Sequence, residues 1–193
     1  MIIKALQSLN WVDIFILVLV GRIVYISAKK GFVIELFKLL GAAMSAYLAL
    51  HYYTRLGSFF NALMPGPPQI PLEFWDFLSL IILSLVGYAI FLVLREAFSR
   101  AFKMEAVSTL NKWGSACLGL LRGVLATSLV LFILLNPTLM YFRNSVLDSY
   151  GGSRLVKFAP GLYQSMWEGL MSKFMPAEGF NQSVIDIQGE LSQ

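Results

Sequence analysis

Long apolar blocks separated by short polar stretches dominate the pattern along this chain. A helix rises about 1.5 Å per residue and the hydrocarbon core of a bilayer is about 30 Å thick, so roughly 20 mostly apolar residues span it. Four blocks approach or exceed this length, at residues 11–28, 31–53, 74–94 and 114–135. We therefore predict an all-α membrane protein whose residues 1–137 form a domain of four transmembrane helices.

Residues 138–176 show a different pattern. After Pro137, which cannot continue a helix, apolar residues recur at helical spacing from Leu155 through Leu162 and Trp167 to Phe174. This spacing predicts an amphipathic helix that is too short and too polar to span, and we expect it to lie on the outer leaflet. The alternative is that it packs on the protein itself. Residues 177–193 lack periodicity and are predicted to be a flexible tail.

Composition supports a membrane protein and argues against an enzyme. Hydrophobic residues make up 58% of the chain and charged residues 13%, against about 45–50% and about 25% in soluble domains. The chain has one histidine and one cysteine, which excludes sites built from several of either and an internal disulfide. It contains no P-loop, GxSxG, HExxH or Mg²⁺-binding carboxylate cluster. We expect no catalytic residues, no cofactor, no metal and no nucleic-acid partner.

Basic residues in the connections predict the orientation. Lys and Arg in short loops tend to remain cytoplasmic. The first and third connections hold Lys29, Lys30, Arg95, Arg100, Lys103 and Lys112, whereas the N-terminus and second connection hold Lys4 and Arg55. We expect both termini to be extracytoplasmic. Cations in the tail oppose this bias, namely Arg143, Arg154, Lys157 and Lys173.

Small residues repeat every four positions on two spans. On the fourth span they are Ser115, Gly119, Gly123 and Thr127, and on the second they are Gly41, Ser45 and Ala49. Such stripes let helix backbones approach closely, so they mark helix–helix interfaces. We expect the two stripes to face each other within one chain, and a second copy of the chain is the alternative partner. The third span has neither a stripe nor an internal charge, and we interpret it as filler.

Charges inside the spans require partners, because an unpaired charge in the membrane is costly. By helical rise, Arg122 lies roughly 12 Å below the cytoplasmic face, Lys38 about 10 Å and Glu35 about 6 Å. Arg22 reaches a similar level, so Glu35 is the predicted counter-ion of Arg122 or Arg22. Near the other face, Asp13, His51 and Asp76 lie at comparable depths and are predicted to form an outer polar layer, with His51 as an interfacial anchor. These charges either fix helix register or line an aqueous or proton pathway.

Several motifs resemble the colicin V production (CvpA) family. They are Trp11-x-Asp13, Gly21, Lys30-Gly31-Phe32-x-x-Glu35, Leu110 to Gly114, Gly119, Arg122-Gly123, Ser153-Arg154-Leu155 and Phe158-Ala159-Pro160. The resemblance covers roughly residues 10–170. The chain has Asn111-Lys112 where an acidic-basic pair is common in that family.

The resemblance implies a small bacterial inner-membrane protein of about four helices that supports colicin V toxin production or export, and tolerance of envelope stress. Membrane lipid, a second copy of the chain, and export or envelope proteins are the expected partners. The alternative function is a small oligomeric channel or transporter in which Asp13, Arg22, Glu35 and Arg122 line the pathway.

Overall fold

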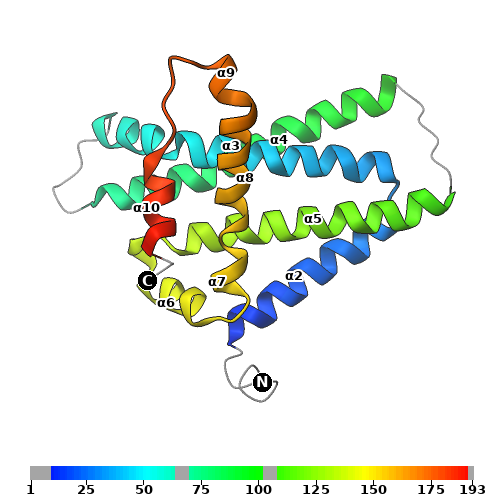
Figure 1. The fold of residues 1–193 in the computed structure, drawn as a ribbon, viewed down its shortest axis with the longest axis horizontal. Helices are drawn as coiled ribbons and strands as arrows, with labels where there is room; N and C mark the ends of the chain where they lie inside the picture. The colour runs from blue at the N-terminus through cyan, green and yellow to red at the C-terminus, as the bar shows by residue number, and fades with distance from the viewer. Residues whose placement is uncertain (1–9, 64–69, 102–107, 191–193) are drawn as a thin grey trace.

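Four long helices form the body of the protein. The computed structural model describes residues 10–63, 70–101 and 108–190, and these contain helices and no strand. The long helices are α2 (Trp11–Ala28), α3 (Phe32–Leu63), α4 (Leu72–Ala101) and α5 (Ser108–Leu134) (Figure 1). All four are long and apolar enough to cross a membrane, so the predicted fold class is confirmed. Residues 64–69 and Lys103 lie outside the described residues.

Three of these helices extend beyond the predicted spans. Helix α3 continues past residue 53 to Leu63, α4 continues past residue 94 to Ala101, and α5 begins before residue 114 at Ser108. The added segments contain enough polar residues to lower the hydropathy but no proline, so nothing in them stops a helix. With 32 residues, α3 is about 48 Å long, and so it exceeds the roughly 30 Å hydrocarbon core.

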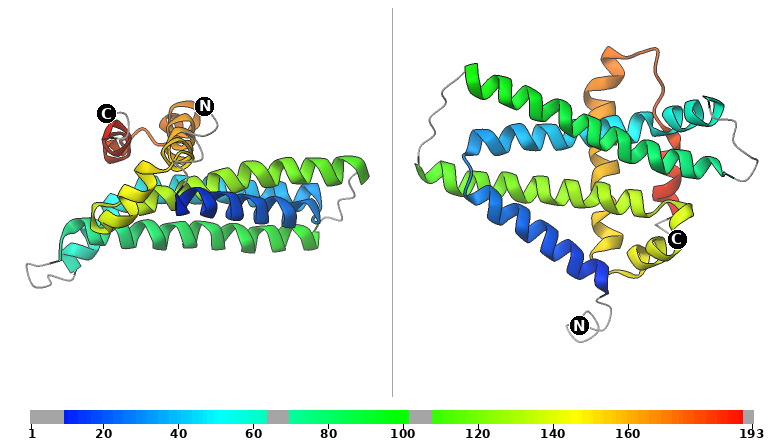
Figure 2. Two further views of the ribbon diagram at one scale, coloured as in Figure 1. Left: turned by 90° about the horizontal axis from the view of Figure 1, so that it is seen from below. Right: turned by 180° about the vertical axis from the view of Figure 1, so that it is seen from behind.

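Helix α3 lies at the centre of the arrangement. It packs along α4 over the most extensive interface of the molecule and also contacts α5, while α2 packs mainly on α5. Helix α4 covers one face of α3, and the C-terminal helices cover the opposite face (Figure 2). The interpretation of the third span as filler is therefore wrong. We call the end of the bundle at the α2–α3 turn, Lys29–Lys30, the hairpin end. The opposite end, where α3 ends at Leu63 and α4 begins at Leu72, is called the capped end.

The two small-residue stripes face different helices from those expected. A Cβ atom on Gly119 would lie 2.3 Å from Ser27 Cβ, so the α5 stripe packs on α2. A Cβ atom on Gly41 would lie 2.7 Å from Phe91 Cβ, so the α3 stripe packs on α4. Ser115, Ala49 and Thr127 are fully buried and Ser45 nearly so. The stripes thus make contacts within the chain, but not with each other, because a stripe marks a face and does not specify its partner.

The C-terminal region packs across the bundle. It comprises η1 (Pro137–Leu139), α6 (Met140–Asp148), α7 (Gly152–Leu155), α8 (Phe158–Met166), the π-helical turn η2 (Trp167–Met171), α9 (Ser172–Phe174) and α10 (Gln182–Glu190). In Figure 1 the α7–α9 segment crosses α3 and α5 nearly at right angles. The face that it buries against the protein's own helices holds Ala159, Tyr163 and Trp167, whereas Phe158, Leu170 and Phe174 of the predicted apolar stripe are exposed.

The segment predicted to be a flexible tail contains helix α10. Val184 is buried in the core and Ile187 packs against it. Val184, Ile185 and Ile187 are too few and too close together to form a recognisable helical period, so the sequence pattern did not reveal this helix.

Ser128 joins α5 to the crossing segment. Its hydroxyl donates to the carbonyl of Val156 at 3.1 Å and accepts the amide N–H of Ala159 at 2.7 Å, and all three residues are fully buried. One side chain therefore satisfies two backbone groups at the α7–α8 junction.

Replacing Ser128 with alanine is expected to destabilise the fold by about 1–3 kcal/mol, because a buried backbone donor and acceptor lose their partner. Unfolding of the purified protein in detergent measures the effect. Ser165→Ala is the matched control, since the Ser165 hydroxyl is exposed and bonds only within its own helix. Equal stability of the two variants would contradict the assigned role of Ser128.

Candidate functional site

A buried ion-pair network joins three helices near the hairpin end. Glu35 in the first turn of α3 is 0% exposed. Its Oε1 atom lies 2.5 Å from Lys38 Nζ, and its Oε2 atom lies 3.1 Å from Arg122 Nη2 on α5. Ser27 at the end of α2 bonds the same Oε2 at 2.9 Å and accepts from Arg122 Nη2 at 3.1 Å. We call these four residues the Glu35 network.

The Glu35 network follows from helix geometry. Glu35 and Lys38 are three residues apart, so they share one face of α3. The close approach of Gly119 to Ser27 brings α2 near α5, one helical turn from Arg122. One carboxylate faces two cations, so the network has an excess positive charge. Arg122 Nε is buried and has no hydrogen-bond partner among the described residues.

Arg22, the alternative to Arg122 as the predicted partner of Glu35, does not join this network. Its side chain is exposed on α2 and makes no ion pair with any residue that the structure describes. The predicted depth of Arg22 is similar to that of Glu35, but Arg22 lies on a different face of α2 from Ser27. Position along the membrane normal does not fix direction around a helix.

The predicted outer layer of Asp13, His51 and Asp76 is not formed, since Asp13 and His51 bind different parts of the chain and Asp76 bonds to neither of them. Asp13 accepts the amide of Asn10 at 3.1 Å, closing a capping box at the start of α2. Its carboxylate also accepts hydrogen bonds from the Ser149 hydroxyl at 2.8 Å and from the Gly151 amide N–H at 2.7 Å. Asp13 therefore fastens the first span to the α6–α7 turn.

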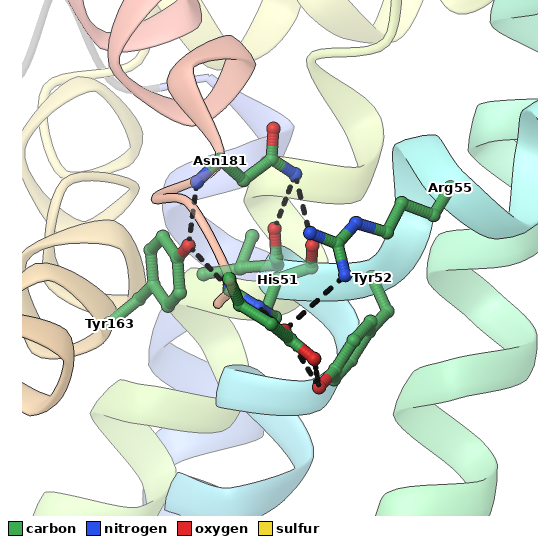
Figure 3. A network of polar contacts seen from close by, with 7 residues as sticks. His51, Tyr52, Arg55, Tyr163 and Asn181 are labelled. Carbon is green, nitrogen blue, oxygen red and sulfur yellow. Dashed lines mark hydrogen bonds and ion pairs between the residues drawn. The ribbon is translucent and has the colours of Figure 1, made fainter. Parts of the chain in front are cut away.

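His51 is the centre of a second network at the capped end (Figure 3). Its side chain is buried and lies between the rings of Tyr47 and Trp167, both stacked on it. Its Nε2 atom lies 2.6 Å from Glu178 Oε2 and its Nδ1 atom 2.9 Å from the Tyr163 hydroxyl. His51 is thus part of the protein core, and its interpretation as an interfacial anchor is corrected.

The remaining bonds of this network hold the segment that precedes α10. Tyr52 donates to Glu178 at 3.1 Å, and Arg55 lies 3.3 Å from the same oxygen. The Asn181 side chain donates to the Leu50 carbonyl at 2.8 Å, and its amide N–H donates to the Tyr163 hydroxyl at 3.0 Å. We call His51, Tyr52, Arg55, Tyr163, Glu178 and Asn181 the His51 network.

The protonation of the His51 network follows from its contacts. Burial raises the pKa of Tyr163, so its hydroxyl remains protonated and can donate to His51 Nδ1. A carboxylate only accepts, so Nε2 of His51 carries the hydrogen shared with Glu178. This hydrogen bond holds the pKa of Glu178 below its usual value of 4.5.

We expect docking of α10 to depend on ionised Glu178. A carboxyl group with a lowered pKa in the folded state contributes stability that is present above its unfolded pKa. That contribution is lost as the pH falls below 4.5 and through the lower folded value. The protection factors of the α10 amides, which are their exchange rates relative to the intrinsic rate at each pH, should therefore be unchanged between neutral pH and pH 5, and lower at pH 3.

The Glu178→Gln variant should show faster α10 exchange already at neutral pH. Glu168→Gln is the control, because Glu168 lies on the same segment and bonds only exposed groups of its own segment. Exchange that responds equally to both substitutions would argue against the docking role of Glu178.

Asp76 belongs to neither the Glu35 network nor the His51 network. Its Oδ1 atom is buried without a hydrogen bond among the described residues. It lies against α3, since a Cβ atom on Gly57 would be 2.0 Å from it. Asp76 also lines a cavity at the capped end.

Sequence reasoning missed several members of both networks. Tyr163, Glu178 and Asn181 lie more than one hundred residues from His51, and no local pattern links them to it. Ser27 was missed because a hydroxyl in a span carries no signal of its own. One signal was available: Asn10 followed three residues later by Asp13 is a helix-start pattern.

A comparison with family models gives a match over most of the chain. The family described as Colicin V production protein matches residues 12–159. The chain belongs to the colicin V production family. No curated protein and no solved structure matches it. Together with the four apolar helices, membership makes this a multi-pass membrane protein.

The extent of the family match separates the two networks. All of the Glu35 network lies within residues 12–159, and so does Asp13 with its partners on the α6–α7 turn. Tyr163, Glu178 and Asn181 lie beyond the match. The Glu35 network therefore belongs to the family region, whereas the His51 network joins that region to the C-terminal segment of this chain.

Proposed function

We propose that this colicin V production family protein is a non-enzymatic component of the bacterial inner membrane. It supports toxin production or export and the integrity of the envelope, with both termini extracytoplasmic. It acts as a rigid membrane scaffold on which export or envelope proteins, or a second copy of the chain, assemble.

The Glu35 network is the observation that carries this proposal. Glu35 has no exposed surface, and both its oxygens are bonded to residues from three helices. Such a closed arrangement fixes the register of α2, α3 and α5 in lipid, where unpaired charges are costly. Asp13, Arg22 and the Glu35–Arg122 pair lie in three separate surroundings, which supports a structural role for these charges.

Complementation tests the scaffold function. Bacteria that make colicin V but lack their own family protein should regain toxin secretion and tolerance of bile salts when they express this chain. A chain that reaches the membrane in normal amount and restores neither property would refute the proposal. Protease access to a C-terminal tag in spheroplasts tests the orientation, and protection of that tag would reverse it.

A small oligomeric channel is the second candidate, and one observation favours it. The Glu35 network carries an excess positive charge, and the buried Nε of Arg122 has no partner among the described residues. A passing anion would supply one. Anion flux into proteoliposomes, measured for wild type, Arg122→Ala and Glu35→Gln, separates the candidates. Absence of flux in the wild type excludes the channel, and flux lost in Arg122→Ala would favour it over the scaffold.

A further inference from the structure

A cavity of about 220 Å³ opens at the capped end, between α3, α4, α5, α6 and α10. Leu80, Phe132 and Ile187 make part of its wall apolar. Three carboxyl groups, those of Glu73, Asp76 and Asp186, line it together with one cation, Arg143. Its lining is therefore both hydrocarbon and acidic, and neither the Glu35 network nor the His51 network contributes a side chain to it.

Two buried polar atoms on this wall lack partners. Tyr53 is 3% exposed, and its hydroxyl makes no hydrogen bond among the described residues, although Ser183 lies nearby on α10. Asp76 Oδ1 is likewise buried without a bond. Buried polar groups in folded proteins are nearly always hydrogen-bonded. An acceptor and a hydroxyl left unpaired beside a cavity therefore indicate a place for a ligand that donates hydrogen bonds.

We propose that this cavity binds the primary ammonium group of an amphiphile, with its apolar chain lying along the hydrocarbon part of the wall. An ammonium group offers three donors and a positive charge, which suits the carboxyl groups and the Tyr53 hydroxyl. A metal ion fits less well, because no group of three or more His, Cys, Asp or Glu side chains in the described part of the chain is placed to hold one.

The same chemistry has two sources. One is a free alkylamine, and the other is the headgroup of an aminophospholipid such as phosphatidylethanolamine. The cavity lies at one end of α3 and α4, two of the helices that are long and apolar enough to cross a membrane. Binding assays with soluble amines and with lipids distinguish the two sources.

Titration calorimetry of the full chain in a maltoside detergent tests the proposal with n-octylammonium. Octanol and octanoate serve as neutral and anionic controls of equal chain length. We expect saturable binding of octylammonium alone. Asp76→Asn should weaken it about tenfold or more, the effect of losing a hydrogen bond to a charged group. Asp148→Asn should leave it unchanged, because Asp148 is exposed and does not line the cavity.

A second variant guards against misfolding, since Tyr53→Phe removes only a hydroxyl and should also weaken octylammonium binding. Octanol binding as tightly as octylammonium would overturn the proposal, as would unchanged affinity in both folded variants. For the lipid source, native mass spectrometry of protein from mixed nanodiscs should show retained phosphatidylethanolamine over phosphatidylcholine, and its loss in Asp76→Asn. Octylammonium binding without lipid retention assigns the site to free amines.

Discussion

Replacing Glu35 with leucine is expected to lower the free energy of unfolding by about 3–5 kcal/mol, the cost of leaving buried charges without their counter-ion. Glu35 is 0% exposed and is the acidic partner that Lys38 and Arg122 share. Leucine is similar in size to glutamate, but it leaves the two cations without a carboxylate to neutralise them. Unfolding in detergent micelles, followed by steric trapping or by thermal melting, measures the loss.

A triple variant provides the matched control. Glu35→Leu combined with Lys38→Met and Arg122→Leu removes all the charges of the network together. Replacement of a complete buried ion pair by apolar residues of similar size is often neutral or stabilising, so the triple variant should recover most of the lost stability. A Glu35→Leu protein as stable as the wild type would contradict this account. It would mean that Lys38 and Arg122 reach water, which favours the channel.

Replacing Gly119 with alanine is expected to destabilise the bundle by about 1–3 kcal/mol, the usual range for overpacking a well-packed interior. The new Cβ atom would lie 2.3 Å from Ser27 Cβ and 2.4 Å from Ser27 Oγ. Because Ser27 belongs to the Glu35 network, α2 cannot move away without breaking its bond to Glu35. The melting temperature in detergent should therefore fall.

Two other glycines serve as controls for Gly119. A Cβ atom on Gly123 would meet its nearest neighbours at 3.5 Å, and one on Gly21 would meet nothing within 4 Å. Gly123→Ala should therefore be tolerated. Gly21→Ala should stabilise α2 by up to about 1 kcal/mol, the difference in helix propensity. If all three variants have the same melting temperature, this would contradict a close contact of α2 with α5 at Gly119.

The length and apolarity of segments and the short motifs predicted those parts of the fold that depend on local sequence alone. The four spans followed from length and apolarity, and the family followed from motifs spread over both halves of the chain. The proximity of Glu35 to Arg122 also followed, because helical rise converts sequence position into depth. Depth did not show which face of α2 carries Arg22, so it could not decide that Arg122 and not Arg22 pairs with Glu35.

Features that depend on tertiary partners could not be predicted in this way. The stripe at Gly119 correctly marked a close contact, but its partner is α2 because the hairpin places Ser27 there. The bond between His51 and Glu178 joins residues 127 positions apart. Neither residue has a periodic or capping signature that would link it to the other.

The bonds of Asp13 have a consequence for the order in which the protein is assembled. Its partner Gly151 follows it by 138 residues, so the ribosome must synthesise all four spans before that bond can form. The first span therefore enters the bilayer before the Asp13 carboxylate can bond to the C-terminal region. Insertion of the helices and their final packing are separate stages, and a chain arrested before residue 149 should remain inserted but susceptible to membrane proteases.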